Sequence, residues 1–175
     1  MEYKIIDKEH KNDINLKNEP FSIYGRMVPK LEEGKWSYSI QKFSEEDVTE
    51  MTFPDENYDY EKMVKNHTFI GAYDGDKCVG LAILADGFLN YMYLDDLKVS
   101  QNYRKHGIGK GLIKKSLEVA ISKKYGGVYT VGQDNNLTAC KFYLSVGFKI
   151  GGFDNHVYQG TPQENKADIL FYLDK

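Results

Sequence analysis

The 175-residue sequence predicts a mixed α/β domain built around one twisted sheet. Three observations indicate this fold class: segments that alternate apolar and polar residues, two segments with a helical repeat of apolar residues, and a turn-forming Asp-Gly pair between apolar runs. At about 150 residues per domain, the length indicates one domain over 1–175. Hydrophobic residues make up 41% of the chain, which excludes disordered and collagen-like classes.

The first half of the chain is predicted to be mostly strands. Residues 4–6 and 21–28 are expected to be short strands, the second bracketed by Pro20 and Pro29 as helix and strand breakers. Aromatic and polar side chains alternate over 36–43, which is typical of a half-buried strand. A short helix is expected over 58–66.

A β-hairpin and a further strand follow. Residues 68–73 and 77–84 flank the sequence Asp74-Gly75-Asp76, and the Asp-Gly pair is a strong turn signal. Residues 91–99 are predicted to form the next strand, since Tyr, Leu and Val alternate there with charged residues.

Two helices and three short strands are expected in the second half. The segment 107–125 is the clearest helix, with Gly126-Gly127 as its stop signal. Its apolar residues recur at a helical period: Ile108, Leu112, Leu117, Ala120 and Ile121. A second helix is expected over 136–146, closed by Gly147. The remaining predicted strands are 128–131, 148–153 and 167–173.

Composition excludes several classes of protein. No apolar run approaches the roughly 20 residues that span a bilayer, and the N-terminus does not resemble a signal peptide, so we expect a cytoplasmic protein without membrane contact. Two cysteines do not make a disulfide framework. The four histidines have no metal-ligand spacing, so no metal is expected. The formal net charge of −3 argues against a nucleic-acid partner.

Charge is nevertheless distributed unevenly. Residues 44–62 contain eight acidic residues and one basic residue, whereas residues 98–124 contain eight basic residues and one acidic residue. This asymmetry suggests two ligands of opposite charge, although two solvated faces would leave the same pattern.

The glycine-rich segment 101–111 carries the densest functional signal. It lies between a predicted strand and the long predicted helix, so free amides and the helix dipole favour an anion there. Arg104, Lys105 and Lys110 add positive charge, and the chemistry suits a pyrophosphate. A P-loop would need Ser or Thr after Gly109-Lys110, where this chain has Gly111. A dinucleotide fingerprint would need G-x-G-x-x-G spacing, which is also not met.

The motif Arg104-x-x-Gly107-x-Gly109, placed after the strand 94–99, resembles the GNAT superfamily of N-acyltransferases. A second block, Asn136 to Tyr143 followed by Gly147-Phe148, agrees with this resemblance in order and spacing. Segments 21–29, 36–38 and 139–154 are most similar to streptothricin acetyltransferases, which acetylate an amine of the antibiotic's β-lysine part. That group usually carries Glu-Asp where this chain has Asp95-Asp96.

The resemblance implies a GNAT-like, mostly antiparallel sheet flanked by helices, with a CoA-binding core at about 91–153. It also implies acetyl-CoA as cosubstrate. Main-chain groups of Leu97 and Val99 would pair with the pantetheine arm, Asn136 would hydrogen-bond that arm, and Tyr143 would lie near the sulfur. The pyrophosphate would be held by the segment Arg104, Lys105, His106, Gly107, Ile108, Gly109 and Lys110.

Acetyl transfer to an amine needs a base and an acid. A lysine-type amine has a pKa near 10.4, so its neutralisation at pH 7 costs roughly 4–5 kcal/mol. Asp95 and Asp96 can accept the proton; as strand neighbours they are expected to point to opposite faces, and the resemblance favours Asp95 as the base. Tyr143 is the expected general acid for the departing thiolate. Cys140 is interpreted as a small core residue, which favours direct attack in a ternary complex.

A cationic acceptor requires an acidic, aromatic-lined pocket. Carboxylates attract ammonium groups and tyrosine rings add cation–π contacts. The expected substrate-binding residues are Asp55, Glu56, Tyr58, Asp154 and Tyr158. The expected partner is a cationic small-molecule amine, bound by a monomer or a homodimer. Polyamines, aminoglycosides and protein N-termini stay open as acceptors, and a non-catalytic acyl-CoA-binding module is the alternative to an enzyme.

Overall fold

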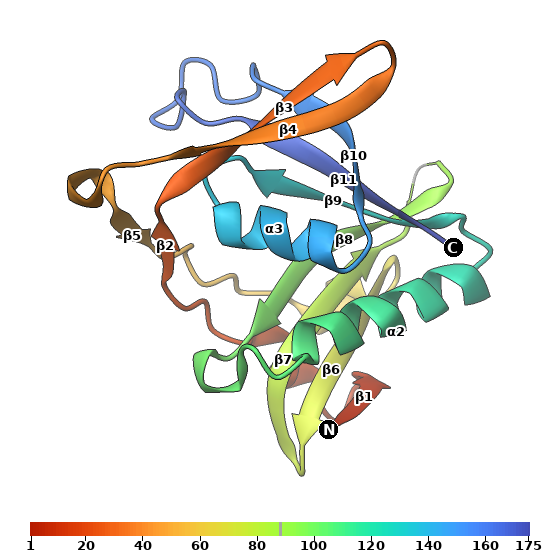
Figure 1. Ribbon diagram of the computed structural model, residues 1–175. Helices are drawn as coiled ribbons and strands as arrows, with labels where there is room; N and C mark the ends of the chain where they lie inside the picture. The colour runs from red at the N-terminus through yellow and green to blue at the C-terminus, as the bar shows by residue number, and fades with distance from the viewer. Residues whose placement is uncertain (88) are drawn as a thin grey trace. The chain divides into compact units, whose positions relative to one another are not determined.

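The computed structural model describes residues 1–87 and 89–175, which divide into two compact units. Unit 1 comprises residues 1–19, 53–129 and 174–175, and unit 2 comprises residues 20–52 and 130–173. The mixed α/β fold class predicted from the sequence is confirmed (Figure 1). Among the described strands, β8 and β9 pair in parallel, whereas the pairs β1–β6, β6–β7, β7–β8, β10–β11, β2–β5 and β3–β4 are antiparallel. No helix of the described chain is long and apolar enough to cross a membrane.

Unit 1 is an antiparallel sheet with one long helix. Its strand order is β1-β6-β7-β8, and β8 pairs in parallel with the start of β9 at residues 91–93. The strands are β1 (Glu2–Ile5), β6 (His67–Asp74), β7 (Lys77–Ala85), β8 (Tyr91–Val99) and β9 (Gly127–Gln133). The other elements are η1 (Lys11–Asn15), α1 (Tyr60–Met63), η3 (Gln101–Tyr103) and α2 (Ile108–Ser122). The predicted hairpin and the strand 91–99 are confirmed.

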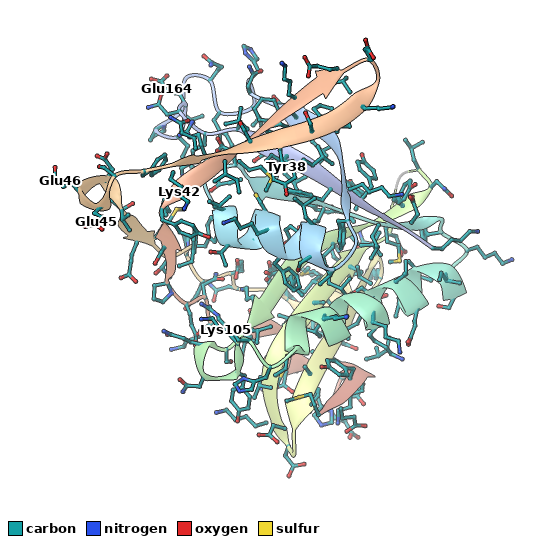
Figure 2. The ribbon with its side chains drawn as sticks, viewed as in Figure 1. Tyr38, Lys42, Glu45, Glu46, Lys105 and Glu164 are labelled. Carbon is teal, nitrogen blue, oxygen red and sulfur yellow. The ribbon has the colours of Figure 1, made fainter. Side chains whose placement is uncertain are left out.

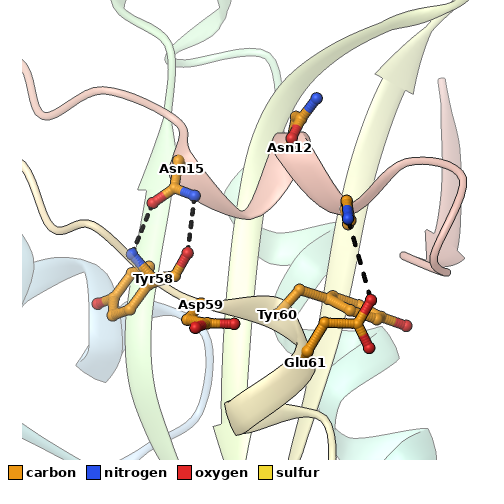
Figure 3. Close-up of a pocket in the computed structure, with 7 residues that line it drawn as sticks. Asn12, Asn15, Tyr58, Asp59, Tyr60 and Glu61 are labelled. Atoms are coloured by element: carbon orange, nitrogen blue, oxygen red, sulfur yellow. Dashed lines mark hydrogen bonds and ion pairs between the residues drawn. The ribbon is translucent and has the colours of Figure 1, made fainter.

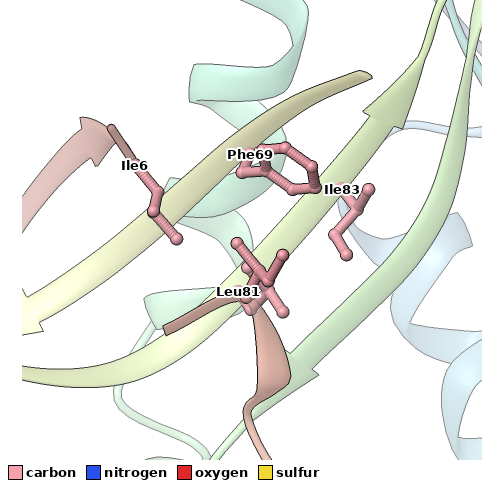
Figure 4. Close-up of a cluster of buried hydrophobic side chains, with 5 residues drawn as sticks. Ile6, Phe69, Leu81 and Ile83 are labelled. Atoms are coloured by element: carbon pink, nitrogen blue, oxygen red, sulfur yellow. The ribbon is translucent and has the colours of Figure 1, made fainter. Parts of the chain in front are cut away.

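The core of unit 1 lies on both faces of this sheet. On one face, Ile6, Phe69, Leu81 and Ile83 form a buried cluster (Figure 4), which Ile14 of η1 completes. On the other, α2 contacts β6, β7 and β8. Gly80 of β7 allows this close approach, because a Cβ there would lie 3.1 Å from side-chain atoms of both Ile108 and Leu112.

Helix α2 ends earlier than predicted. It stops at Ser122 rather than at the pair Gly126-Gly127, because Lys124 adopts a left-handed conformation with φ of +67°. The Tyr125 amide donates to the Ala120 carbonyl and the Lys124 amide to the Ile121 carbonyl, which is the hydrogen-bond pattern of a Schellman cap. Ile121, which the sequence analysis placed in the apolar repeat of this helix, is 47% exposed, whereas its neighbour Ala120 is fully buried.

Unit 2 contains two small antiparallel pairs and the C-terminal strands. β2 (Phe21–Ile23) pairs with β5 (Thr49–Met51), and β3 (Gly25–Glu32) pairs with β4 (Lys35–Lys42). The end of β9 is followed in the sheet by β11 (Asp168–Asp174) and β10 (Lys149–Asp154). Helix α3 (Leu137–Ser145) contacts β3 and β10, and η2 (Glu45–Asp47) follows the hairpin.

The predicted strand over 21–28 is instead two strands separated at Tyr24, and the second continues through Pro29. Pro29 is tolerated because β3 pairs only with β4 in a two-stranded sheet, so one edge needs no amide. The strand predicted over 36–43 is present, but it is mostly exposed rather than half-buried. Figure 2 shows the side chains of Tyr38 and Lys42 on this hairpin.

Candidate active site

A β-bulge in β8 brings two carboxylates to one face of the unit 1 sheet. Leu84 pairs with Leu94 and Ile83 pairs with Asp96, so Asp95 is the extra residue between two ladder pairs. Asp96 therefore shares the face of Ile83 and its neighbour Phe69. Asp95 Oδ2 lies 3.9 Å from His67 Nε2, and the His67 ring stacks on Phe69. The prediction that the two side chains point to opposite faces is wrong, because the bulge interrupts the alternation of the strand.

Glu56 and Tyr58, two of the predicted substrate-binding residues, join this acidic cluster. The Tyr58 hydroxyl donates to Asp96 Oδ2 at 3.3 Å. Burial, followed by the charges of Asp96, Glu56 and Asp95, raises the pKa of Tyr58, so the phenol stays protonated and serves as a donor. Asn15 fixes this segment from η1, since its side chain hydrogen-bonds to both the amide and the carbonyl of Tyr58 (Figure 3).

A surface cavity of about 290 Å³ lies beside the same segment. It is lined by Lys11, Asn12, Asn15, Tyr58, Asp59, Tyr60 and Glu61. These side chains are polar or aromatic, and Lys11 forms an ion pair of 3.9 Å with Glu61 across it (Figure 3). Residues 58–61 therefore border a surface cavity, and the Tyr58 hydroxyl of the same segment reaches Asp96.

Lys98 is buried within the acidic cluster, although sequence reasoning assigned it no role. Its ammonium donates to Glu56 and to the Leu16 carbonyl and lies 3.0 Å from Asp96, and only 9% of the side chain is exposed. A strand places residues i and i+2 on one face, so the spacing from Asp96 to Lys98 could have revealed this pair. The cluster holds three carboxylates against one ammonium.

Burial sets the protonation of these groups. It raises the pKa of Asp96, an effect that Lys98 partly offsets. It also raises the pKa of Asp95, where His67 acts in the opposite direction and Glu56 adds to the increase. For Glu56, hydrogen bonds from Lys98 and Asn18 outweigh burial, and the pKa is lowered. Asp95 and Asp96 are thus the more basic carboxylates, as proton acceptors should be.

The loop before α2 has the geometry of an anion site. Gly107, the residue that precedes the helix, has φ of +79° and no side-chain cap, and a Cβ there would meet no atom within 4 Å. The first amides of the helix have no intrahelical acceptor. Lys105, His106 and Lys110 are exposed around them, and Lys105 projects from the loop in Figure 2. A pyrophosphate fits such a donor set.

Neighbouring predicted cofactor residues have defined contacts. Ile108 is buried, so only its main chain is available to a ligand. Arg104 donates to the Val99 carbonyl and pairs with Glu19 at 3.3 Å, contacts that orient the loop. Leu97 and Val99 pair with β7, whereas the register with β9 ends at Tyr93.

The predicted residues of unit 2 are largely engaged within that unit. Asn136 caps α3 by accepting from the Ala139 amide at 3.2 Å, which leaves its amide group as a possible donor. Tyr143 is 9% exposed and contacts the rings of Phe142, Phe148 and Phe171. Cys140 is fully buried, and burial raises the pKa of its thiol to about 12, which fits a core residue and not a nucleophile.

Asp55, Asp154 and Tyr158 also have structural partners. Asp55 accepts from the Asn18 amide at 2.7 Å in unit 1. In unit 2, Asp154 accepts from the amides of His156 and Val157, and the Tyr158 hydroxyl donates to Asp168. Glu56 and Tyr58 are thus the predicted substrate residues that the structure brings together with Asp95 and Asp96. No group of three or more potential metal ligands occurs in the described residues.

Comparison with known proteins identifies the family. The sequence model described as the Acetyltransferase (GNAT) family matches residues 31–148, which is more than half of the chain. The chain belongs to the GNAT family. Streptothricin acetyltransferase A of Bacillus subtilis is 32% identical over 170 residues, covering 96% of this chain and 98% of that protein. Streptothricin acetyltransferase of Escherichia coli is 28% identical over 102 residues, covering 58% and 59%.

Solved structures agree with this GNAT assignment. A Bacillus anthracis protein, provisionally assigned as a streptothricin acetyltransferase and crystallised with acetyl coenzyme A, superposes with a TM-score of 0.88 at 25% identity, covering 99% of this chain and 98% of that one. Nourseothricin acetyltransferase has a TM-score of 0.78 at 18% identity, covering 99% and 97%, and so shares the fold. This GNAT protein is an N-acetyltransferase, which removes the alternative of a non-catalytic binding module.

Proposed function

We propose that this enzyme transfers an acetyl group from acetyl-CoA to an amine of streptothricin, at its β-lysine part, and thereby confers resistance to the antibiotic. The observation that carries the proposal is the acidic cluster at the bulge, where three carboxylates outnumber the ammonium of Lys98. Such a face attracts a polycationic amine. The similarity over 96% of the chain to the Bacillus subtilis enzyme supports streptothricin as that amine.

The anion site before α2 would hold the pyrophosphate of acetyl-CoA, which supplies the thioester to be attacked. Residues 104–110 would contribute main-chain amides and the charges of Arg104, Lys105 and Lys110. Leu97 and Val99 would offer main-chain groups of β8 to the pantetheine arm, as an added strand does. The Asn136 amide group would donate to the same arm.

The reaction requires the acceptor to lose a proton before it attacks. Asp95 would accept the ammonium proton, and Asp96 would bind the substrate cation together with Glu56. The Tyr58 hydroxyl, kept protonated by burial and then by the neighbouring carboxylates, donates to Asp96 and holds it in place. Tyr143 would donate a proton to the departing thiolate, and general-acid assistance of this kind is typically worth about 10²- to 10⁴-fold. Direct attack in a ternary complex is favoured because Cys140 is buried.

The test measures thiol release from acetyl-CoA by the purified protein with streptothricin, spermidine, an aminoglycoside and an N-terminal peptide. We expect fast release with streptothricin and a mass increase of one acetyl group on its β-lysine part. Release with another amine alone would overturn the substrate and keep the enzyme class. Asp95→Asn should lower kcat at least tenfold. Asp86→Asn is the matched control and should leave kcat unchanged, because Asp86 is an exposed carboxylate that pairs with Lys123.

A further inference from the structure

One ring nitrogen of His67 faces Asp95. The sequence analysis gave this histidine no role. His67 Nδ1 lies 3.2 Å from the Met63 carbonyl oxygen and 2.9 Å from Asn66 Oδ1. A main-chain carbonyl can only accept, so Nδ1 carries the hydrogen. In the neutral ring, Nε2 therefore has its lone pair free, and Nε2 lies 3.9 Å from Asp95 Oδ2.

Charged groups near Asp95 are paired with one another. Lys98 engages Glu56 and Asp96, Glu56 also raises the pKa of Asp95, and Tyr58 stays a neutral phenol. Within the described part of the chain, His67 is the basic side chain at ion-pair distance from Asp95. The ring stacks on Phe69 at an interplanar angle of 13° and is 16% exposed at the side chain, so it is oriented but retains a path to water.

We propose that His67 Nε2 takes over, from Asp95, the proton that the acceptor ammonium loses, so that the two residues form a proton relay. This inference rests on the proposed function. In the first step the acceptor N–H bond breaks and its proton passes to the Asp95 carboxylate, leaving a neutral amine and a carboxylic acid. In the second the proton passes to His67 Nε2, which restores the carboxylate and leaves an imidazolium beside it. The imidazolium then returns the proton to solvent.

The relay is useful because an ordinary carboxylate is a much weaker base than the amine whose proton it must accept. Carboxyl groups ordinarily titrate near 4 and imidazoles near 6.5, whereas a lysine-type amine titrates near 10.4. An ordinary imidazole therefore holds a proton about 300-fold more firmly than an ordinary carboxylate does. Burial raises the pKa of Asp95, so this carboxylate accepts the proton of the amine more readily than an exposed carboxylate would.

The activity test uses the amine that the parent enzyme turns over fastest among the amines above. His67→Gln should lower kcat at least tenfold, change the acidic limb of the pH profile, and leave the KM for acetyl-CoA unaltered. Added imidazole should restore activity to His67→Ala, with a pH dependence that follows free imidazole. His10→Gln is the control, because His10 also pairs with a carboxylate, Asp7, at 2.9 Å but on exposed surface.

A second measurement needs no substrate. Long-range ¹H–¹⁵N correlation spectra of the free protein should show His67 as the Nδ1–H tautomer at neutral pH. An Nε2–H tautomer, or an unchanged pH profile in a folded His67→Gln variant without imidazole rescue of His67→Ala, overturns the relay. These results are distinct from failure of the proposed function, which would appear as absence of turnover of streptothricin by the parent enzyme.

Discussion

Replacement of Lys98 by Met tests the buried ion cluster on which the site depends. The change keeps most of the side-chain volume but removes the ammonium that pairs with the carboxylates of Glu56 and Asp96. The Asp96 carboxylate is largely buried, since only 13% of its side chain is exposed, so water cannot fully replace the lost partner. Breaking a buried ion pair typically costs about 3–5 kcal/mol. Because 32% of the Glu56 side chain is exposed, we expect the lower end, about 3 kcal/mol. For a domain of this size the midpoint temperature should fall by about 6–12 °C.

The stability lost in Lys98→Met should depend on pH. The lowered pKa of Glu56 means that its ionised form stabilises the fold above the ordinary value of 4.5, and this contribution is lost on acidification. The raised pKa of Asp96 means that its ionised form costs stability as the pH rises above 3.8. Removing Lys98 takes away its stabilisation of ionised Glu56 and enlarges the cost of ionising buried Asp96. Both effects require ionised carboxyl groups. The loss in the free energy of unfolding should therefore be largest at neutral pH and shrink toward about pH 4.

Urea unfolding of the parent and Lys98→Met, followed by circular dichroism at about pH 7.5 and about pH 4, measures this difference. Lys62→Met is the matched control, because Lys62 pairs with Asp59 at 3.1 Å but its side chain is 84% exposed. The control should unfold with the parent. An equal deficit at both pH values, or none at either, would refute the assignment of Lys98 as the counter-ion of a buried carboxylate pair.

Three further changes test other parts of the site. Asn136→Ala removes the cap of α3 and should cost about 1 kcal/mol in urea unfolding; full stability would mean that the Ala139 amide finds another acceptor. Gly107→Val forces a branched side chain into a backbone with φ of +79° and into the space beside the helix amides, so calorimetry should show at least tenfold weaker acetyl-CoA binding, and normal binding would misplace the anion site. Tyr143→Phe should lower kcat at least tenfold with little change in acetyl-CoA affinity, and unchanged turnover would remove Tyr143 as the acid.

The local features of the chain were predictable from its sequence. The glycine-rich segment before α2, the helix that follows Asn136 and the hairpin over 67–85 depend on residues close together in the chain, where conformational preference and hydrogen bonding are local. The same motifs, in order and spacing, were sufficient for the GNAT resemblance, which the family match over 31–148 confirms.

The end of α2 and the continuation of β3 through Pro29 depended on packing as well as local preference. Lys124 takes the left-handed position that glycine usually fills, so the helix ends before Gly126 is reached. Pro29 fits because β3 lies in a described sheet of two strands, where β4 pairs with one of its edges. In both places the tertiary context overrides the preference of the single residue.

The geometry of the acidic cluster, and the inclusion of Lys98 and His67 in it, were decided by tertiary structure. Its geometry depends on the bulge at Asp95, the extra residue between the pairs Leu84–Leu94 and Ile83–Asp96. The alternation of side chains along a strand predicts opposite faces for Asp95 and Asp96, and the bulge interrupts that alternation. Lys98, Glu56 and His67 come from three separate segments and meet only when the register between strands is set. The sequence by itself therefore determined the family and the reaction type, whereas the bulged register of β7 and β8 decided that Asp95 and Asp96 lie on one face of the sheet, near Lys98 and His67.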